Sequence, residues 1–394
     1  MHVSSRKLNS PVACPTSKSY AARILILASL VKKPFHIIDL PKAQDTKDLV
    51  AALKICGLEI EDGLVRNSFP ACEQSLSEKV KLPVGEGGTT IRFLLPFLAL
   101  GQKEYQLIFA EGMLKRPMKA MYQALQNSGV KVIETAEGVN IQGPLDHRAK
   151  LKIDASLSSQ FASGVEMLKV AGVINTNIEN LNHSQAYFEM TQYCLQVVRE
   201  KNTFTIPVDM SSLAYFLCYA VLNQDLLIQN VFKSDDLQAD SAIFEILRSI
   251  GAEFHFQAQG LQIKMLEKRQ QAFSIDSRDC IDLVPTLIYL ASYLDGTSQF
   301  THLKHLRVKE SDRLSEMINI MNLCEIKYVY NEVADEMMIH GNSKHQFQIN
   351  KIDTADDHRM VMVASLYLKQ NGGGEVYPGN SVRKSFPQFF EYFS

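Results

Sequence analysis

Basic and acidic side chains gather at a few points of this 394-residue chain, each time close to an apolar run. The densest group is Arg307–Arg313, Arg-Val-Lys-Glu-Ser-Asp-Arg, and Asp356–Arg359 opens a second apolar run. Arginine and lysine bind phosphate and carboxylate groups, whereas aspartate and glutamate can transfer protons. These residue types therefore predict a polyanion site with acid–base groups. Asp282, alone before Leu283-Val284-Pro285, fits either a helix N-cap or a catalytic carboxylate.

The first half of the chain carries three further openings of this kind. Ser17–Arg23 places Lys18 and Ser19 at an expected helix start, with Arg23 one turn later on the same face. Gly85–Arg92 offers glycines and hydroxyls, and Ser156–Gln160 offers hydroxyls and an amide. Helix N-termini carry unpaired N–H groups and attract anions. Each motif alone is also typical of an ordinary cap, but several on one scaffold favour anion binding.

Six apolar helices are expected to position these groups, and they recur evenly. They are Ser17–Leu30, Gly88–Leu100, Ser158–Ala171, Ser211–Leu222, Asp282–Leu294 and Asp356–Leu368. The markers Ser19, Thr89, Ser159, Ser212, Asp282 and Asp357 follow one another at steps of 70, 70, 53, 70 and 75 residues. Regular spacing of similar segments indicates an internal repeat.

A second, amphipathic helix follows most of these openings, at Thr46–Cys56, Met118–Asn127, Ala239–Ser249 and Ser311–Asn322. Three of these end in glycine followed by a β-like run, at Gly57–Ile60, Gly129–Val132 and Gly251–Phe254. Glycine supplies the left-handed residue that ends many helices. Gln106–Phe109 and Gly260–Lys264 alternate as strands do. The chain is therefore predicted to hold six α/β units, three in each of two domains.

The bulk properties exclude several classes of protein. A net charge of −2 and a pI near 6.6 give no general attraction to nucleic acid or anionic membranes. The N-terminus lacks the apolar region of a secretory signal, and the apolar stretches are too short to span a bilayer. The seven cysteines are scattered, without disulfide or zinc spacing. We expect a cytoplasmic protein with buried thiols and no metal ligand set, Walker loop or dinucleotide fingerprint.

The motifs, taken in order, resemble the enolpyruvyl transferases of the EPSP synthase (3-phosphoshikimate 1-carboxyvinyltransferase) family along almost the whole chain. The matching residues are Lys18, Ser19 and Arg23; Gly88, Thr89 and Arg92; Arg116, Pro117 and Met118; Ser158 to Phe161; Lys309 to Arg313; Asp357 to Met360; and Lys384 to Pro387. The resemblance rests on seven motifs in collinear order.

This resemblance implies an α/β fold, a two-domain inside-out α/β barrel built from six βαβαββ-type repeats, three to a domain. Residues 1–16 with 210–394 would form the domain that contains both termini, 17–209 would form the inserted domain, and the active site would lie in the cleft between them. It also implies transfer of the enolpyruvyl group of phosphoenolpyruvate to the 5-hydroxyl of shikimate 3-phosphate, with release of phosphate. We expect a monomer that needs no cofactor, metal, nucleic acid or membrane.

Site residues follow from the resemblance position by position. Asp282 is the expected base on the 5-hydroxyl, and Glu310 with Lys18 would deliver and return a proton. Shikimate 3-phosphate would contact Lys18, Ser19, Arg23, Ser158, Ser159, Gln160, Ser184, Tyr187, Asp282, His305 and Lys309. Phosphoenolpyruvate would contact Lys18, Gly88, Arg116, Gln160, Arg313, Arg359 and Lys384.

Three other functions are alternatives to this reaction. A UDP-N-acetylglucosamine enolpyruvyl transferase shares the implied fold, but that family usually carries a reactive cysteine where Glu111–Arg116 has none. An RNA 3′-phosphate cyclase would need a nucleotide site and a covalent histidine, for which no segment matches. A non-catalytic binder of phosphorylated metabolites fits Glu86, which stands where relatives usually have asparagine. Retention of Asp282, Glu310 and Lys18 favours the enzyme.

Overall fold

A computed structural model of the chain describes residues 1–394 except 147, 149 and 174. The described chain divides into two compact units. The terminal unit holds Met1–Pro15 and Val208–Ser394, and the inserted unit holds Thr16–Pro207. Each unit contains three small β-sheets and its own set of helices. No helix within these described residues combines the length and the apolar character that crossing a bilayer requires.

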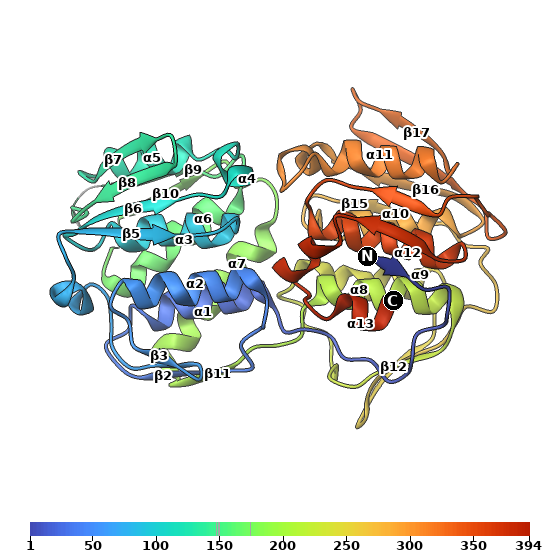
Figure 1. The fold of residues 1–394 in the computed structure, drawn as a ribbon, viewed down its shortest axis with the longest axis horizontal. Coiled ribbons are helices and arrows are strands. Elements are labelled where there is room, and N and C mark those ends of the chain that lie inside the picture. Colours follow the sequence, from blue (N-terminus) through green and yellow to red (C-terminus); the bar gives the residue numbers. More distant parts are fainter. Residues whose placement is uncertain (147, 149, 174) are drawn as a thin grey trace. The chain divides into compact units, whose positions relative to one another are not determined.

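The inserted unit places its helices between its sheets (Figure 1). Its helices are α1 (Lys18–Ala28), α2 (Gln44–Ile55), α3 (Gly88–Leu98), α4 (Glu111–Leu114), α5 (Lys119–Gln126), α6 (Ser159–Met167) and α7 (Gln185–Glu200). Its strands are β2 (Phe35–Ile38), β3 (Ile60–Glu61), β4 (Leu64–Val65), β5 (Lys79–Pro83), β6 (Glu104–Ile108), β7 (Lys131–Thr135), β8 (Gly138–Gln142), β9 (Leu151–Asp154), β10 (Thr176–Glu179) and β11 (Thr203–Thr205).

The terminal unit follows the same plan. Its helices are α8 (Met210–Asn223), α9 (Ile243–Ser249), α10 (Val284–Ser292), α11 (Arg313–Leu323), α12 (His358–Gln370) and α13 (Phe389–Phe393). Its strands are β1 (His2–Val3), β12 (Leu226–Ile228), β13 (Phe254–Gln257), β14 (Gly260–Ile263), β15 (Ser274–Asp276), β16 (Gly296–Thr301), β17 (Lys327–Asn331), β18 (Glu336–Gly341), β19 (Lys351–Asp353) and β20 (Gly374–Tyr377).

One strand topology recurs in four of the six sheets: a parallel pair followed by an antiparallel hairpin. The orders β5-β6-β8-β7, β15-β16-β18-β17 and β11-β2-β4-β3 all have it. In the sheet β12-β14-β13 the segment at Val12 takes the first place, through a parallel bridge to Ile228. The other two sheets keep the parallel pair, β9 with β10 and β19 with β20. The prediction of six repeats, three in each unit, is confirmed.

The first helix of each repeat forms the core of its unit. Helices α1, α3 and α6 pack together in the inserted unit, and α8, α10 and α12 pack together in the terminal unit. These helices are buried almost all round: every residue of α10 and of Met210–Leu222 is buried. A helix that is apolar on every side must lie inside a protein. The sheets therefore cover the helices, which is the inside-out arrangement that the family resemblance implies.

The second helices and their glycine ends also occur as predicted. Helices α2, α5 and α11 match the expected amphipathic segments, and the fourth is a 3₁₀ turn, Ala239–Ala242, that continues into α9. Gly57, Gly129 and Gly251 have φ of +90°, +87° and +79°, the left-handed conformation expected after a helix. After these glycines, the strands begin one or two residues later than expected, at Ile60, Lys131 and Phe254.

Both chain ends belong to the terminal unit, where the first strand contacts the last helix. His2 and Val3 pair antiparallel with Glu375 and Gly374, as the resemblance implied for the N-terminal residues. Ser4 N donates to Phe393 O at 3.0 Å, which ties the first strand to the last helix. Six of the seven cysteines are buried and Cys72 is half-buried, close to the expectation of buried thiols.

Candidate functional site

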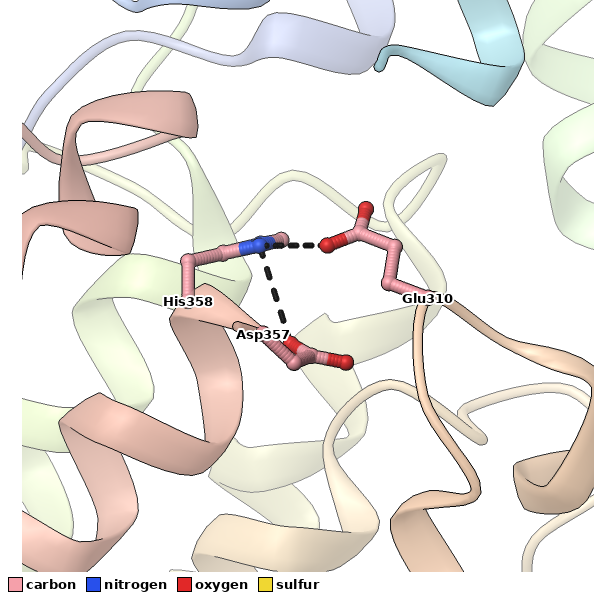
Figure 2. Close-up of side chains that lie close together, drawn as sticks. All are labelled: Glu310, Asp357 and His358. Carbon is pink, nitrogen blue, oxygen red and sulfur yellow. Dashed lines mark hydrogen bonds and ion pairs between the residues drawn. The ribbon is translucent and has the colours of Figure 1, made fainter. Parts of the chain in front are cut away.

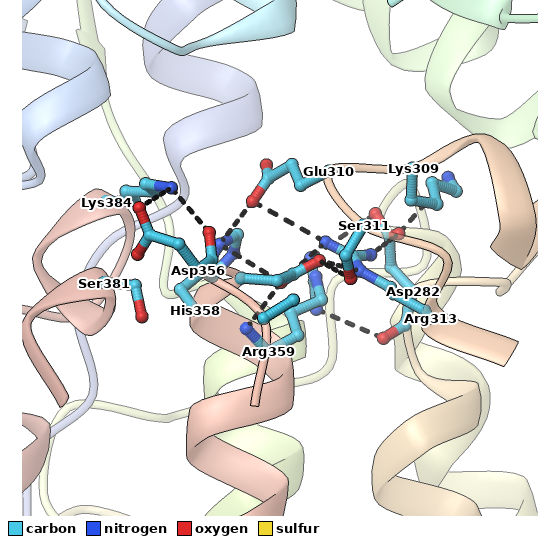
Figure 3. Close-up of polar contacts among 12 residues, drawn as sticks. Asp282, Lys309, Glu310, Ser311, Arg313, Asp356, His358, Arg359, Ser381 and Lys384 are labelled. Atoms are coloured by element: carbon cyan, nitrogen blue, oxygen red, sulfur yellow. Dashed lines mark hydrogen bonds and ion pairs between the residues drawn. The ribbon is translucent and has the colours of Figure 1, made fainter. Parts of the chain in front are cut away.

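In the terminal unit, three cations surround Asp282. Lys309 Nζ lies 3.2 Å from Asp282 Oδ1, and Arg313 Nη1 donates to the same oxygen at 2.9 Å. Arg359 Nη2 lies 3.4 Å from Oδ2, and its Nη1 donates to the Asp282 backbone carbonyl at 3.2 Å. Figure 3 shows these side chains converging from separate segments. We call these four residues the Asp282 cluster.

The helix starts explain how residues far apart in the sequence meet in the Asp282 cluster. Leu283, not Asp282, is the N-cap of α10, so the alternative that Asp282 caps this helix is wrong. Arg313 is the first residue of α11, and Arg359 is the second residue of α12. The Asp282 carboxylate is thus left to pair with the cations that two other helix starts present.

The charges of the cluster perturb one another strongly. Burial alone would raise the pKa of Asp282, but Arg359, Lys309 and Arg313 outweigh it and hold that pKa well below its usual range. Burial lowers the pKa of Lys309, although Asp282 partly offsets this. Only 19% of the Asp282 side chain is exposed, so little solvent screens these pairs. In this state Asp282 is a fixed anion that holds cations in place.

Arg313 connects the cluster to a second group of side chains. Its Nε lies 2.7 Å from Asp357 Oδ2, and its Nη2 lies 3.8 Å from Glu310 Oε2. His358 Nδ1 lies 2.8 Å from Glu310 Oε2 and 3.7 Å from Asp357 Oδ1 (Figure 2). Asp357 also caps α12 by accepting from Arg359 N at 2.9 Å. The Glu310 carboxylate is therefore oriented by both a histidine and an arginine.

Glu310, Asp357 and His358 are also a group that could hold a metal ion, since one ligand atom of each lies within 4.8 Å of the others. Arg313 already pairs with both carboxylates, however, and the Glu310–His358 contact is a hydrogen bond. A cation is thus already in place beside the two carboxylates. No metal-ligand spacing is visible in the sequence here, because these residues come from two segments about fifty positions apart.

Two more predicted residues lie in the terminal unit. Lys384 Nζ donates to the Asp356 carbonyl at 2.8 Å, which places it beside the start of α12. His305 is half-buried on a 3₁₀ turn, Lys304–Val308, that leads to Lys309. Burial, with the charge of Lys309, lowers the pKa of His305, so its imidazole is neutral near pH 7. A neutral imidazole can both donate and accept a hydrogen bond.

Asp240 is a residue of this site that the sequence analysis missed. It is 1% exposed, its Oδ2 accepts a hydrogen bond from Ser211 Oγ, and Ser211 also accepts from Arg359 Nη2 at 3.2 Å. Burial, opposed by Arg359 and reinforced by Asp282, raises the pKa of Asp240 to about 7. Asp240 is the second residue of a 3₁₀ turn within a segment predicted only as amphipathic helix, and nothing in that pattern singles it out.

In the inserted unit, the starts of α1, α2 and α3 meet at Asp45. Lys18 Nζ lies 2.7 Å from Asp45 Oδ2, and Thr90 Oγ1 donates to the Asp45 carbonyl at 3.5 Å. Ser17 caps α1 by accepting from Tyr20 N. The ammonium group of Lys18 is therefore held at a point where several helix N-termini present N–H groups.

Arg116 lies directly over Gly88 at the start of α3. A methyl group at Gly88 would lie 2.4 Å from Arg116 Nη1 and 2.7 Å from its Cζ. Only glycine leaves room for the guanidinium there, because a carbon atom cannot approach so closely. The Nε atom of Arg116 is buried with no hydrogen-bond partner among the described residues. These two predicted phosphoenolpyruvate contacts are thus in contact with each other.

Arg92 fixes the next pair of predicted residues. Its Nη1 donates to Gln160 Oε1 at 2.7 Å and to Ser158 Oγ at 3.4 Å, and its guanidinium lies 5.0 Å from the centre of the Phe161 ring. Gln160 Nε2 in turn donates to Thr89 Oγ1 at 2.8 Å. Burial, with the charge of Arg116, lowers the pKa of Arg92 to about 9. The sequence matched Arg92 to a family motif but gave it no contact role.

Arg23 organises the remaining predicted residues. Its Nη2 donates to the Tyr187 carbonyl at 2.9 Å, its Nη1 to the Ser19 carbonyl at 2.8 Å, and its Nε to Thr191 Oγ1 at 2.8 Å. Its guanidinium lies 5.8 Å from the centre of the Tyr187 ring. Ser184, at the start of α7, and Ser159, at the start of α6, are both buried. The inserted unit thus presents a second set of cations and helix starts.

Comparison with known proteins agrees with this geometry. A family model described as EPSP synthase (3-phosphoshikimate 1-carboxyvinyltransferase) matches residues 3–201 and 196–393. The chain belongs to the EPSP synthase family. The fold and the resemblance drawn from the sequence motifs are thereby confirmed.

Individual members of the EPSP synthase family match over nearly the full length. The 3-phosphoshikimate 1-carboxyvinyltransferase of Pyrococcus abyssi is 29% identical, over 98% of this chain and 94% of its own. That of Clostridium novyi is 26% identical, over 98% and 95%. The solved EPSP synthase of Acinetobacter baumannii shares the fold, with a TM-score of 0.76 and 21% identity over 99% of this chain and 96% of its own.

Proposed function

We propose that this chain transfers the enolpyruvyl group of phosphoenolpyruvate to the 5-hydroxyl of shikimate 3-phosphate. The hydroxyl oxygen would bond to C2 of phosphoenolpyruvate while C3 gains a proton, which gives a tetrahedral intermediate. Loss of a proton from C3 and of the phosphate from C2 would then give 5-enolpyruvylshikimate 3-phosphate. The observation that carries the proposal is the Asp282 cluster, a carboxylate among three cations beside the Glu310–His358 pair.

The low pKa of Asp282 suits a base that is switched on by substrate. Without ligands, Arg313 and Arg359 pair with its carboxylate. The phosphate and carboxylate of phosphoenolpyruvate compete for the same guanidinium groups, because arginine binds such oxyanions with paired hydrogen bonds. When the cations turn to the substrate, the Asp282 carboxylate becomes more basic and can accept the 5-hydroxyl proton.

Glu310 and Lys18 would carry the proton that C3 gains and loses. Glu310 is 20% exposed and is oriented by His358, so its carboxyl is both accessible and fixed. Lys18 is fixed by Asp45 in the inserted unit. A positioned acid or base contributes about 10²–10⁴-fold in rate. The cations would stabilise the charge of the departing phosphate.

We propose that both units act on the same pair of substrates. Arg23, Ser158, Ser159, Ser184 and Tyr187 of the inserted unit would bind shikimate 3-phosphate together with Lys309 and His305 of the terminal unit. Arg116, Gly88 and Gln160 would bind phosphoenolpyruvate together with Arg313, Arg359 and Lys384. The buried Arg92 supports this assignment, since it holds Ser158 and Gln160 in place. We further propose that the enzyme acts as a monomer in the cytoplasm, without a cofactor.

The direct test is release of phosphate from phosphoenolpyruvate. We expect release only when shikimate 3-phosphate is also present, and the product should carry one enolpyruvyl group by mass spectrometry. UDP-N-acetylglucosamine serves as the alternative acceptor. Release with that acceptor alone would refute the proposed substrate, and tight binding of shikimate 3-phosphate without release would indicate a non-catalytic binder.

A further inference from the structure

The inserted unit contains a cavity of about 410 Å³ beside the Arg116 segment. Its wall is formed by α4, the start of α5, the last two residues of β7, the first residue of β8, and residues Leu157 and Phe161. Arg116 is its one lining residue to which a substrate contact is assigned above. The cavity is large enough for a small organic ligand, since such sites typically measure about 300–1,000 Å³.

Most of the cavity wall is apolar and aromatic. Phe109, Tyr122 and Phe161 supply rings, all at most 9% exposed. Leu114 and Leu157 are 45% and 47% exposed, so large apolar side chains meet solvent here. Aromatic walls favour a flat apolar ligand body through ring contacts.

The polar groups of the wall favour a negative charge on that ligand. Lys115, Arg116 and Lys119 contribute three cations against the single carboxylate of Glu134. Lys115 also lies 4.0 Å from Glu111, on the solvent side, where both side chains are largely exposed. Lys119, in contrast, opens α5, where the helix N-terminus adds to the positive potential.

Two wall atoms lack hydrogen-bond partners among the described residues. They are Thr135 Oγ1 and Arg116 Nε, and both are buried. Buried polar atoms are nearly always paired in folded proteins, with the protein, with water or with a ligand. Both groups can donate a hydrogen bond, and a carboxylate accepts such bonds.

We propose that this cavity binds a small carboxylate with a flat apolar or aromatic body, at a site separate from the two substrates. The ring lies among Phe109, Tyr122 and Phe161, and the carboxylate faces Lys119 and Arg116. The substrate contacts proposed above include neither the apolar wall nor Thr135.

Arg116 makes this site a means of regulation. Its guanidinium lies over Gly88, and the same side chain lines the cavity. A carboxylate in the cavity competes for this guanidinium with phosphoenolpyruvate, so each ligand weakens binding of the other by the same factor. This coupling rests on the proposed function, whereas binding to the cavity does not.

Binding is tested by calorimetry on the full chain without substrates, with 3-phenylpropionate, 3-phenylpropanol and 3-phenylpropylamine as probes. We expect the carboxylate to bind at least about 10-fold more tightly than the alcohol, which corresponds to one charge-assisted contact, and the amine to bind least. Equal binding of the three probes, or no binding, would overturn the proposal.

Matched variants locate the site. Ala120→Phe fills the cavity and should abolish binding, whereas Ala136→Phe, on the exposed turn outside the wall, should not. Lys119→Met should reduce carboxylate binding about 10-fold and leave the alcohol unchanged. It also keeps the test valid if Ala120→Phe fails to fold. Binding that survives both Ala120→Phe and Lys119→Met would place the ligand elsewhere.

A fluorescence reporter and a kinetic assay complete the test. The chain contains no tryptophan, so Leu157→Trp introduces a single tryptophan at the cavity mouth. Its emission should change with 3-phenylpropionate but not with 3-phenylpropylamine. In the wild type, 3-phenylpropionate should raise the KM for phosphoenolpyruvate and not that for shikimate 3-phosphate. An unchanged KM with confirmed binding would overturn the coupling alone.

Discussion

Arg313 donates a hydrogen bond of 2.9 Å to Asp282, although its helix begins thirty-one residues further along the chain. The same guanidinium pairs with Asp357, so it is shared between a carboxylate proposed to react and one that caps a helix. An arginine held by both cannot leave the site, but it can exchange one partner for a substrate oxyanion. The Asp282 cluster is therefore fixed in position and still able to respond to substrate.

Asp282→Asn should remove the base and leave most of the binding groups in place. We expect kcat to fall about 10²–10⁴-fold, with a much smaller change in the dissociation constant of shikimate 3-phosphate. Steady-state phosphate release and calorimetry measure the two quantities. Asp276→Asn is the control, because Asp276 is more exposed and pairs with Arg278 and His302. A loss of affinity equal to the loss of rate would contradict the role as base.

The pH at which kcat/KM falls on the acid side, the acid limb of its pH profile, should depend on Arg359. Its charge is the leading cause of the lowered pKa of Asp282, so the free enzyme should stay active below the usual aspartate pKa of about 3.9. Because the pKa of Asp282 is lower in the folded chain than in the unfolded chain, its charge also stabilises the fold above about pH 3.9. This stabilisation is lost as the pH falls. Arg359→Met should move the acid limb to higher pH, whereas Arg383→Met, an exposed neighbour of Lys384, should not. A limb that stays in place would refute the charge coupling.

Gly88→Ala should damage the contact between Gly88 and Arg116. The added methyl group would lie 2.4 Å from Arg116 Nη1 and displace the guanidinium. We expect kcat/KM for phosphoenolpyruvate to fall by up to about 10²-fold, since small displacements of binding groups have such effects. Gly112→Ala is the matched control, because nothing lies within 4 Å of the added carbon there. Equal kcat/KM values for the two variants would show that the Arg116 guanidinium can move without weakening the reaction of phosphoenolpyruvate.

The fold was predictable because local patterns repeat. Small polar residues before apolar runs mark helix starts, and Ser17, Ser158 and Asp357 do cap helices. Glycines such as Gly57 mark helix ends because few other residues accept a positive φ. The pairing of Val12 with Ile228 was not predictable in this way, since it joins segments 216 residues apart without a local signal.

For the site, the sequence predicted individual residues but not the contacts between them. Asp282 could be named, but two of the cations that lower its pKa lie on other helices, and local sequence carries no information about such distances. Asp240 reads as part of an amphipathic helix, because burial and a short contact to Ser211 arise only from packing. The same holds for Arg92, whose role depends on contacts more than sixty residues away.

Asp240 should make the stability of the fold depend on pH. Burial raises its pKa to about 7 in the folded chain, against about 3.9 when unfolded. The folded state therefore binds the proton more tightly, and this stabilisation is lost as the pH rises toward 7. A shift of this size corresponds to about 4 kcal/mol at most.

Asp240→Asn removes the titration, so its free energy of unfolding relative to wild type should rise between pH 5 and pH 8, on the order of a few kcal/mol. Urea unfolding at several pH values measures this difference. Asp236→Asn, an exposed aspartate of the preceding loop, should follow the wild-type curve. If Asp240→Asn is equally destabilising at every pH, Asp240 is ionised in the fold and Arg359, rather than burial, determines its charge.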